Sequence, residues 1–180
     1  MELEFVAPDL RRLDELSGEL VVCCVWSDER PFGALAGMLD WRFGGRIAAL
    51  VKSRFVDGTG GESLLVPGRP HVPFEKVLIL GLGARAAFGD GTFRDAIDRI
   101  VSAMIGMRVR KAVVELPGRG HGAIEPGRAI SLLFDRAMSN EDLDAWWLVE
   151  DAHAEKLMRE SAKEEERRAR QAAMRTQEAR

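Results

Sequence analysis

The sequence has few cysteines, few histidines, no tyrosine and no long hydrophobic run. Its two cysteines, Cys23 and Cys24, are adjacent, so they form no disulfide framework. The three histidines (His71, His121 and His153) are far apart and lack the spacing of metal ligands. No segment approaches the roughly 18 consecutive apolar residues of a membrane span. The net charge of −3 argues against a protein built to bind nucleic acid or an anionic membrane.

What is present indicates one globular domain with an appendage. The chain has 180 residues, of which 46% are hydrophobic and 31% charged, a composition typical of a folded protein and not of a disordered one. Its first residues, Met1–Phe5, lack the basic and apolar regions of a secretory signal. We therefore expect a cytoplasmic protein.

Continuous apolar runs predict strands that are buried on both faces, as in a sheet covered by helices. Such runs occur at Glu19–Trp26, Lys76–Leu80 and Lys111–Leu116. Shorter segments predict three more strands, with the first of them at a sheet edge: Leu3–Ala7, Ser63–Val66 and Trp146–Val149.

Apolar residues at three- and four-residue steps predict helices between these strands. The helical segments are Phe32–Arg54, Phe93–Arg108 and Gly127–Met138. We expect Gly44-Gly45 to bend the first segment or to divide it into two helices. Long helices can cross over between parallel strands, so this order predicts an α/β layered domain over residues 1–150.

Residues 151–180 differ from the rest of the chain, because they hold no glycine or proline and many charged residues. Pairs such as Glu164/Arg168 and Glu166/Arg170 are four residues apart in the favourable acid-first order. The segment is therefore predicted to be a charged C-terminal helix that projects from the domain. Its apolar positions are too sparse for a coiled-coil heptad, so a solvated helix and a helix that pairs with another chain stay open.

Four segments in order resemble the N-terminal domain of the M17 leucyl aminopeptidase family: ELVVCCVW, the loop FVDGTGGESLLVP, KVLILGLGAR and KAVVELPG. The resemblance implies a macrodomain-like, three-layer α/β/α fold with a mixed, mostly parallel sheet. It also implies a domain without catalytic residues, since the family's two-metal catalysis belongs to a C-terminal domain. That domain's signature, a stretch like Asn-Thr-Asp-Ala-Glu-Gly-Arg, has no counterpart in this sequence.

Two glycine-rich loops that follow predicted strands are the candidate ligand sites. Glycine-rich backbone at the end of a strand can cradle a phosphate group, although neither loop has a dinucleotide-binding or P-loop motif. A structural turn is the alternative for the first loop and a solvated surface loop for the second. The candidate residues are Gly81, Gly83, Arg85 and Gly89 in the first loop, and Gly118, Arg119, Gly120, His121 and Gly122 in the second.

These observations favour a stand-alone, non-catalytic binding or assembly module that contacts a protein partner or further copies of itself. M17 enzymes assemble as hexamers, so the resemblance makes self-association plausible. The alternative is binding, or hydrolysis, of a nucleotide or ADP-ribose-type ligand at the two glycine loops, where Arg119 would pair with a phosphate. We expect no catalytic residues, no metal and no cofactor.

Overall fold

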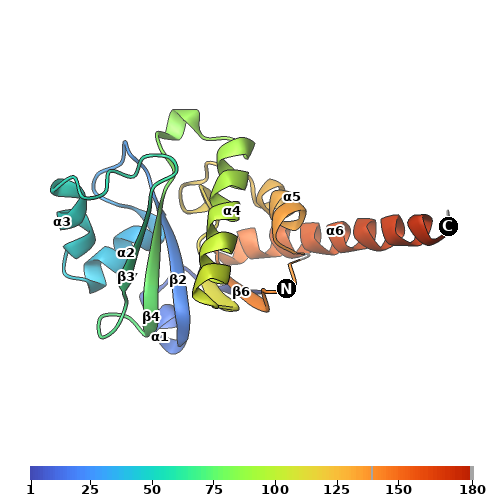
Figure 1. The fold of residues 1–180 in the computed structure, drawn as a ribbon, viewed down its shortest axis with the longest axis horizontal. Coiled ribbons are helices and arrows are strands. Elements are labelled where there is room, and N and C mark those ends of the chain that lie inside the picture. Colours follow the sequence, from blue (N-terminus) through green and yellow to red (C-terminus); the bar gives the residue numbers. More distant parts are fainter. Residues whose placement is uncertain (139, 179–180) are drawn as a thin grey trace.

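The computed structural model describes residues 1–138 and 140–178. Within these residues the chain forms a six-stranded sheet in the order β1-β6-β5-β2-β4-β3 (Figure 1). Edge strand β3 is antiparallel to β4, and the other neighbouring strands are parallel. The strands are β1 (Glu2–Val6), β2 (Gly18–Val25), β3 (Ser63–Pro67), β4 (Phe74–Gly81), β5 (Lys111–Val114) and β6 (Ala145–Val149).

The buried run at the predicted second strand forms the centre of the sheet. Strand β2 lies between β4 and β5, and its residues from Leu20 to Val25 are all buried. Alternate residues face opposite sides, so Val22 and Cys24 join one hydrophobic cluster while Val21 and Cys23 join the other. A strand with two covered faces gains burial from every side chain, which explains its continuous apolar sequence.

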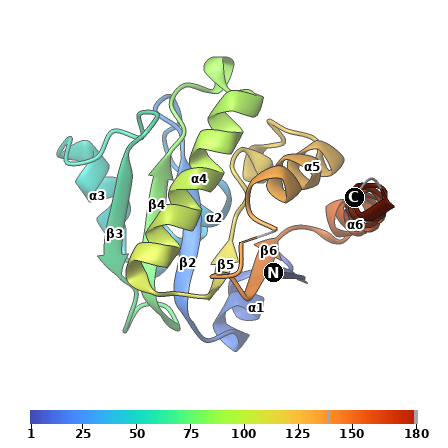
Figure 2. The ribbon, with the colours of Figure 1, turned by 45° about the vertical axis from the view of Figure 1, so that its right-hand side comes forward.

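Helices cover both faces of the sheet, which confirms the three-layer α/β/α prediction (Figure 2). Helices α4 (Asp90–Met107) and α5 (Pro126–Arg136) pack on one face through residues such as Ile97 and Ile130. The other face is covered by helices that contribute Leu13, Leu39 and Ile47 to its core: α1 (Leu10–Glu15), α2 (Ala34–Arg42) and α3 (Arg46–Lys52).

The glycine pair divides the first predicted helix into α2 and α3. Gly44 and Gly45 have φ angles of 63° and 80°, a region that glycine enters without steric cost. Asp40 then accepts hydrogen bonds from the N–H groups of Ile47 and Ala48, at 2.8 and 3.0 Å, and so caps α3. The two short helices meet at a corner formed by these glycines.

The charged tail forms one helix, α6 (Ala152–Glu178), that leaves the layered body and extends away from it (Figure 1). Its first turns are anchored: Met158 is fully buried, and the Ser131 hydroxyl donates to Glu165 at 2.8 Å. Beside this anchor, Glu164 and Arg168 form an exposed ion pair. None of the helices in the described part of the chain is long and apolar enough to cross a membrane.

Candidate functional site

The two predicted glycine loops lie side by side at the carboxyl ends of the central strands. Strands β4, β2 and β5 are adjacent and parallel, so the segments that follow them lie side by side at their carboxyl ends. The loop of Gly81–Gly89 follows β4, and the loop of Gly118–Gly122 follows β5. The segment Ser27–Gly33, which follows β2, lies between them. Open α/β sheets bind ligands at such an edge.

Glu29, in the segment after β2, joins the two loops. Its Oε1 lies 2.5 Å from Nη2 of Arg85 and 2.7 Å from Nε2 of His121. Because the Trp26 indole N–H donates to Nδ1 of His121 at 3.1 Å, Nε2 carries the ring proton and donates to Glu29. The structure therefore brings Arg85 and His121, both candidates from the sequence, to one carboxylate.

Arg119, the cation that was assigned to a ligand phosphate, pairs within the chain. Its Nε and Nη2 donate to the two carboxylate oxygens of Glu150 at 2.8 and 2.9 Å, and Nη1 donates to the Ile124 carbonyl at 2.7 Å. The two charged side chains are only 10% and 5% exposed. Such a two-point pair fixes the loop after β5 to the end of β6.

Glu115 is a buried carboxylate that our reading of the sequence did not select. It follows β5, is 3% exposed, and accepts hydrogen bonds from the N–H groups of Cys24 at 3.1 Å and Leu35 at 3.0 Å. Burial and, to a smaller extent, the nearby charges of Glu150 and Glu29 raise its pKa to about 7 against the opposing effect of these two bonds. The signal in the sequence was an acidic residue inside the apolar run KAVVEL.

The glycines of both loops are required by turns and close approaches. A Cβ on Gly120 would lie 2.3 Å from Oε1 of Glu115, and one on Gly81 would lie 2.1 Å from the Thr59 carbonyl oxygen. Gly83, Gly118 and Gly122 have φ angles of 80°, 77° and 63°. These positions have structural roles, whereas a Cβ on Gly89, the last candidate, would meet open space.

The site as a whole alternates acids and bases across three loops. Glu29 contacts Arg85 and His121, and Glu150 contacts Arg119. Within residues 1–138 and 140–178, no group of three or more His, Cys, Asp or Glu residues is arranged to hold a metal ion. The arrangement mainly holds the loops together, with Arg85 its more exposed cation at 45%.

The chain can now be placed among known proteins. The sequence profile of the cytosol aminopeptidase family, N-terminal domain, matches residues 21–132, more than half of the chain. The chain belongs to this family. A probable cytosol aminopeptidase from Pseudomonas fluorescens SBW25 is 36% identical over 87 residues, which are 48% of this chain and 18% of the relative. One from Pseudomonas aeruginosa UCBPP-PA14 is 28% identical over 131 residues, covering 71% of this chain and 26% of that protein. The chain thus matches about a fifth to a quarter of these aminopeptidases.

Solved structures confirm the macrodomain-like fold of this N-terminal-type domain. A mutant Oceanobacillus iheyensis macrodomain superposes with a TM-score of 0.72 at 8% identity, covering 92% of this chain and 93% of that one. A mutant tomato leucine aminopeptidase has a TM-score of 0.60 at 14% identity, covering 89% of this chain and 35% of that one. The Trypanosoma brucei macrodomain in complex with ADP has a TM-score of 0.66 at 15% identity, covering 89% and 68%. At these identities the likeness shows the fold alone.

Proposed function

We propose that this cytosol aminopeptidase N-terminal-type domain is a non-catalytic binding and assembly module that works through protein contacts. The observation that carries the proposal is the two-part character of α6. Its first turns are fixed to the body by Met158 and by the Ser131–Glu165 hydrogen bond, whereas its later turns extend past the body. An anchored helix that extends from a rigid domain presents a surface to another chain at little further cost in ordering.

The site at the strand ends supports the non-catalytic part of the proposal. Its buried acids are already engaged: Glu150 by Arg119, and Glu115 by two backbone N–H groups. A catalytic acid or base needs access to a substrate proton within hydrogen-bond distance. Glu115 and Glu150 are 3% and 6% exposed, so their oxygens serve the fold.

Removal of residues 168–180 tests the role of the tail in assembly. This truncation keeps Met158 and Glu165, so the contacts of α6 with the body remain. We expect the full chain to form an oligomer and the truncated chain to contain fewer copies per assembly, both measured by light scattering. Circular dichroism controls for folding. An equal number of copies in the two assemblies, or a monomeric full chain, would reject self-assembly through α6.

Binding of a phosphate-bearing ligand at the two glycine loops is the second candidate function. It is favoured by the meeting of the loops at the strand ends and by the macrodomain fold, of which one relative by structure was solved with ADP. Both arginines are ion-paired, but Arg85 is 45% exposed beside Glu29 whereas Arg119 is only 10% exposed beside Glu150, so Arg85 would supply the charge.

A thermal-shift titration with ADP-ribose tests this second function. A ligand that binds only the folded state raises the melting temperature. We expect Arg85→Ala to lower the affinity about tenfold, and Arg136→Ala, which removes a similarly exposed and ion-paired arginine on α5, to leave it unchanged. No shift with the unmodified protein, or equal shifts in both variants, would count against a ligand site at these loops.

A further inference from the structure

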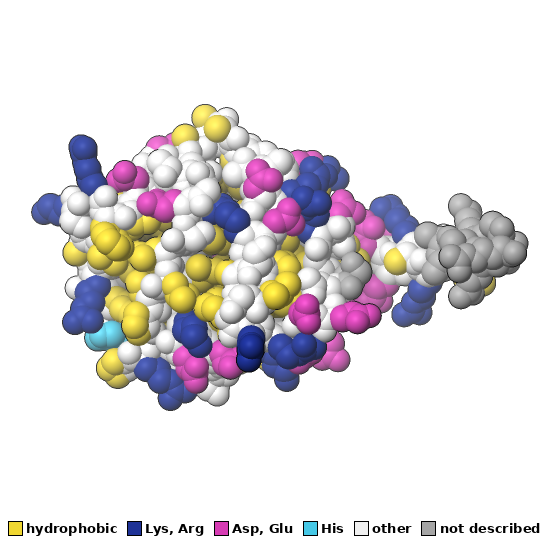
Figure 3. Space-filling view, viewed as in Figure 1, with side chains coloured by type: hydrophobic (Ala, Val, Ile, Leu, Met, Phe, Trp, Pro, Cys, Tyr) yellow, Lys and Arg dark blue, Asp and Glu magenta, His cyan; other side chains and the backbone are white. Residues whose placement is uncertain are grey.

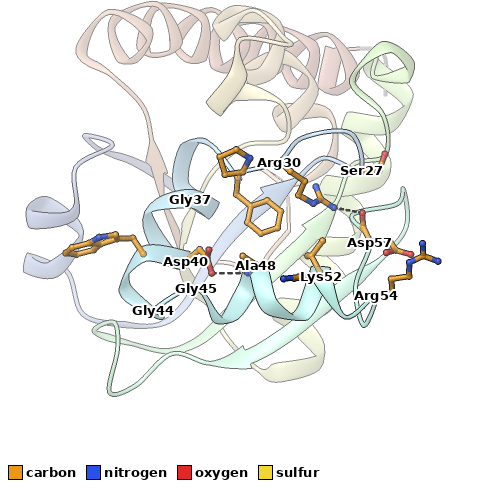
Figure 4. A pocket seen from close by; sticks show the side chains of 14 residues that line it. Ser27, Arg30, Gly37, Asp40, Gly44, Gly45, Ala48, Lys52, Arg54 and Asp57 are labelled. Atoms are coloured by element: carbon orange, nitrogen blue, oxygen red, sulfur yellow. Dashed lines mark hydrogen bonds between the residues drawn. The ribbon is translucent and has the colours of Figure 1, made fainter.

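A groove separate from the glycine loops lies between the segment after β2 and the α2–α3 corner (Figure 4). Its volume is about 990 Å³, at the upper end of typical ligand pockets. In the wall of the groove, Gly37 lets the backbone of α2 approach the backbone of Phe32, because a Cβ at residue 37 would lie 2.4 Å from the Phe32 carbonyl oxygen. Gly44 and Gly45 leave the far end open, since a Cβ on either residue would meet nothing within 4 Å.

Arg30 is held in this groove by neutral acceptors. Its guanidinium donates to the carbonyl oxygens of Trp26 at 2.7 Å, Asp57 at 3.1 Å and Glu29, and it lies 5.0 Å from the centre of the Phe32 ring. These contacts fix the position of the group, and none of them is a carboxylate that would neutralise its charge. A fixed guanidinium of this kind is suited to bind a carboxylate or phosphate.

Two more cations, Lys52 and Arg54, line the same groove, and Figure 4 shows them at the end where Arg30 and Asp57 lie. Within the described residues, Arg30, Lys52 and Arg54 have no acidic side chain within 4.0 Å. Of the two acids in the lining, Asp40 is engaged in capping α3. The other acid, Asp57, is exposed at the same end of the groove, so three cations face one exposed carboxylate there and the groove keeps an excess of positive charge that is complementary to an acidic occupant.

Two large aromatic side chains near the groove are exposed, and the Trp41 ring already has the Arg42 guanidinium 5.4 Å from its centre. Trp41 lines the groove and is 69% exposed, and Phe55, directly after Arg54, is 68% exposed. Figure 3 shows hydrophobic side chains next to basic ones at the α3 end of the molecule. Tryptophan and arginine together are characteristic of the centres of protein interfaces.

We propose that the α2–α3 groove binds an acidic peptide segment of a partner protein, one that carries aromatic or large apolar side chains among its carboxylates. The carboxylates pair with Arg30, Lys52 and Arg54, and the apolar side chains cover Trp41 and Phe55. A small free anion would satisfy the cations but leave both rings in water, whereas an extended segment covers both. The proposal does not depend on the tail helix, so truncation of α6 leaves this binding intact.

Fluorescence polarisation with three labelled peptides of about 12 residues tests the proposal. The probes are repeats of Glu-Glu-Phe, Glu-Glu-Ser and Lys-Lys-Phe. We expect Glu-Glu-Phe to bind with a Kd below about 1 mM, Glu-Glu-Ser to bind at least about tenfold more weakly, and Lys-Lys-Phe to show no binding. Absence of Glu-Glu-Phe binding at about 1 mM would overturn the proposal.

Variants locate the binding in the groove. Lys52→Ala combined with Arg54→Ala, and separately Trp41→Ala, should each weaken Glu-Glu-Phe binding about tenfold with an unchanged circular dichroism spectrum. The matched controls are Lys111→Ala, an exposed cation at the opposite end of the sheet, and Ile105→Ala, an exposed apolar side chain on α4. Binding that is insensitive to the groove variants would refute the assignment. Equal binding of Glu-Glu-Phe and Glu-Glu-Ser, with full competition by pyrophosphate and no effect of Trp41→Ala, would show a small-anion site instead.

Discussion

The free energy of unfolding of the unmodified protein is expected to fall by about 3 kcal/mol between about pH 5 and pH 8, and Glu115→Gln is expected to abolish this fall. The native pKa of Glu115 is about 7, above the ordinary value of 4.5, because the carboxyl group is buried. The native state therefore holds this proton more tightly than the unfolded chain does. Stability is greatest below the unfolded pKa and falls as the pH rises through about 7, and it becomes independent of Glu115 above that pH.

Urea denaturation of both proteins at the two pH values measures this effect. Glutamine keeps one acceptor for the N–H groups of Cys24 and Leu35 but cannot ionise, so the variant should have the smaller pH dependence. All other titratable groups are common to both proteins, so their contributions cancel in the difference. Equal pH dependence in the two proteins would mean that Glu115 does not ionise in this window.

Arg119→Ala is expected to lower the free energy of unfolding by about 3 to 5 kcal/mol. The substitution removes a two-point partner from Glu150, whose side chain is only 5% exposed, and leaves a carboxylate without its counter-charge in a poorly solvated place. It also removes the hydrogen bond to the Ile124 carbonyl. Denaturant unfolding monitored by tryptophan fluorescence gives the value.

Two further variants separate burial from simple loss of charge. Arg119→Lys retains the charge without the planar fork, so its loss should be smaller than that of alanine. Arg168→Ala removes a tail arginine that is 61% exposed and should change the stability by less than about 1 kcal/mol. A loss as small for Arg119→Ala as for Arg168→Ala would show that the pair with Glu150 adds nothing beyond a surface ion pair.

The strands and the layered arrangement could be predicted because a strand buried on both faces has a continuous run of apolar residues in the sequence. The runs ending at Trp26, Leu80 and Leu116 are apolar apart from their first residues and Glu115, and the first of them forms the centre of the sheet. The glycine pair beginning at Gly44 correctly predicted the break between α2 and α3, because glycine itself tolerates a positive φ whatever its surroundings.

Short elements and long-range pairs were missed for the opposite reason. Helix α1 (Leu10–Glu15) is too short to show a helical period, and it depends on the cap provided by Asp9, which accepts from the Arg11 N–H, and on the burial of Leu13. Glu115 looked like a strand residue, because its partners, Cys24 and Leu35, are distant in the sequence.

The sequence by itself determined the strands, the main helices, the charged tail and the family of this protein, since each depends on residues that are close along the chain. Only the tertiary structure decided which charges meet. It directed Arg119 to Glu150 and brought Arg85 and His121 to Glu29. It also left Arg30, Lys52 and Arg54 together in a groove. The physical reason is that ion pairs and grooves are formed by loops from different strands, and their distances are set by packing of the whole sheet.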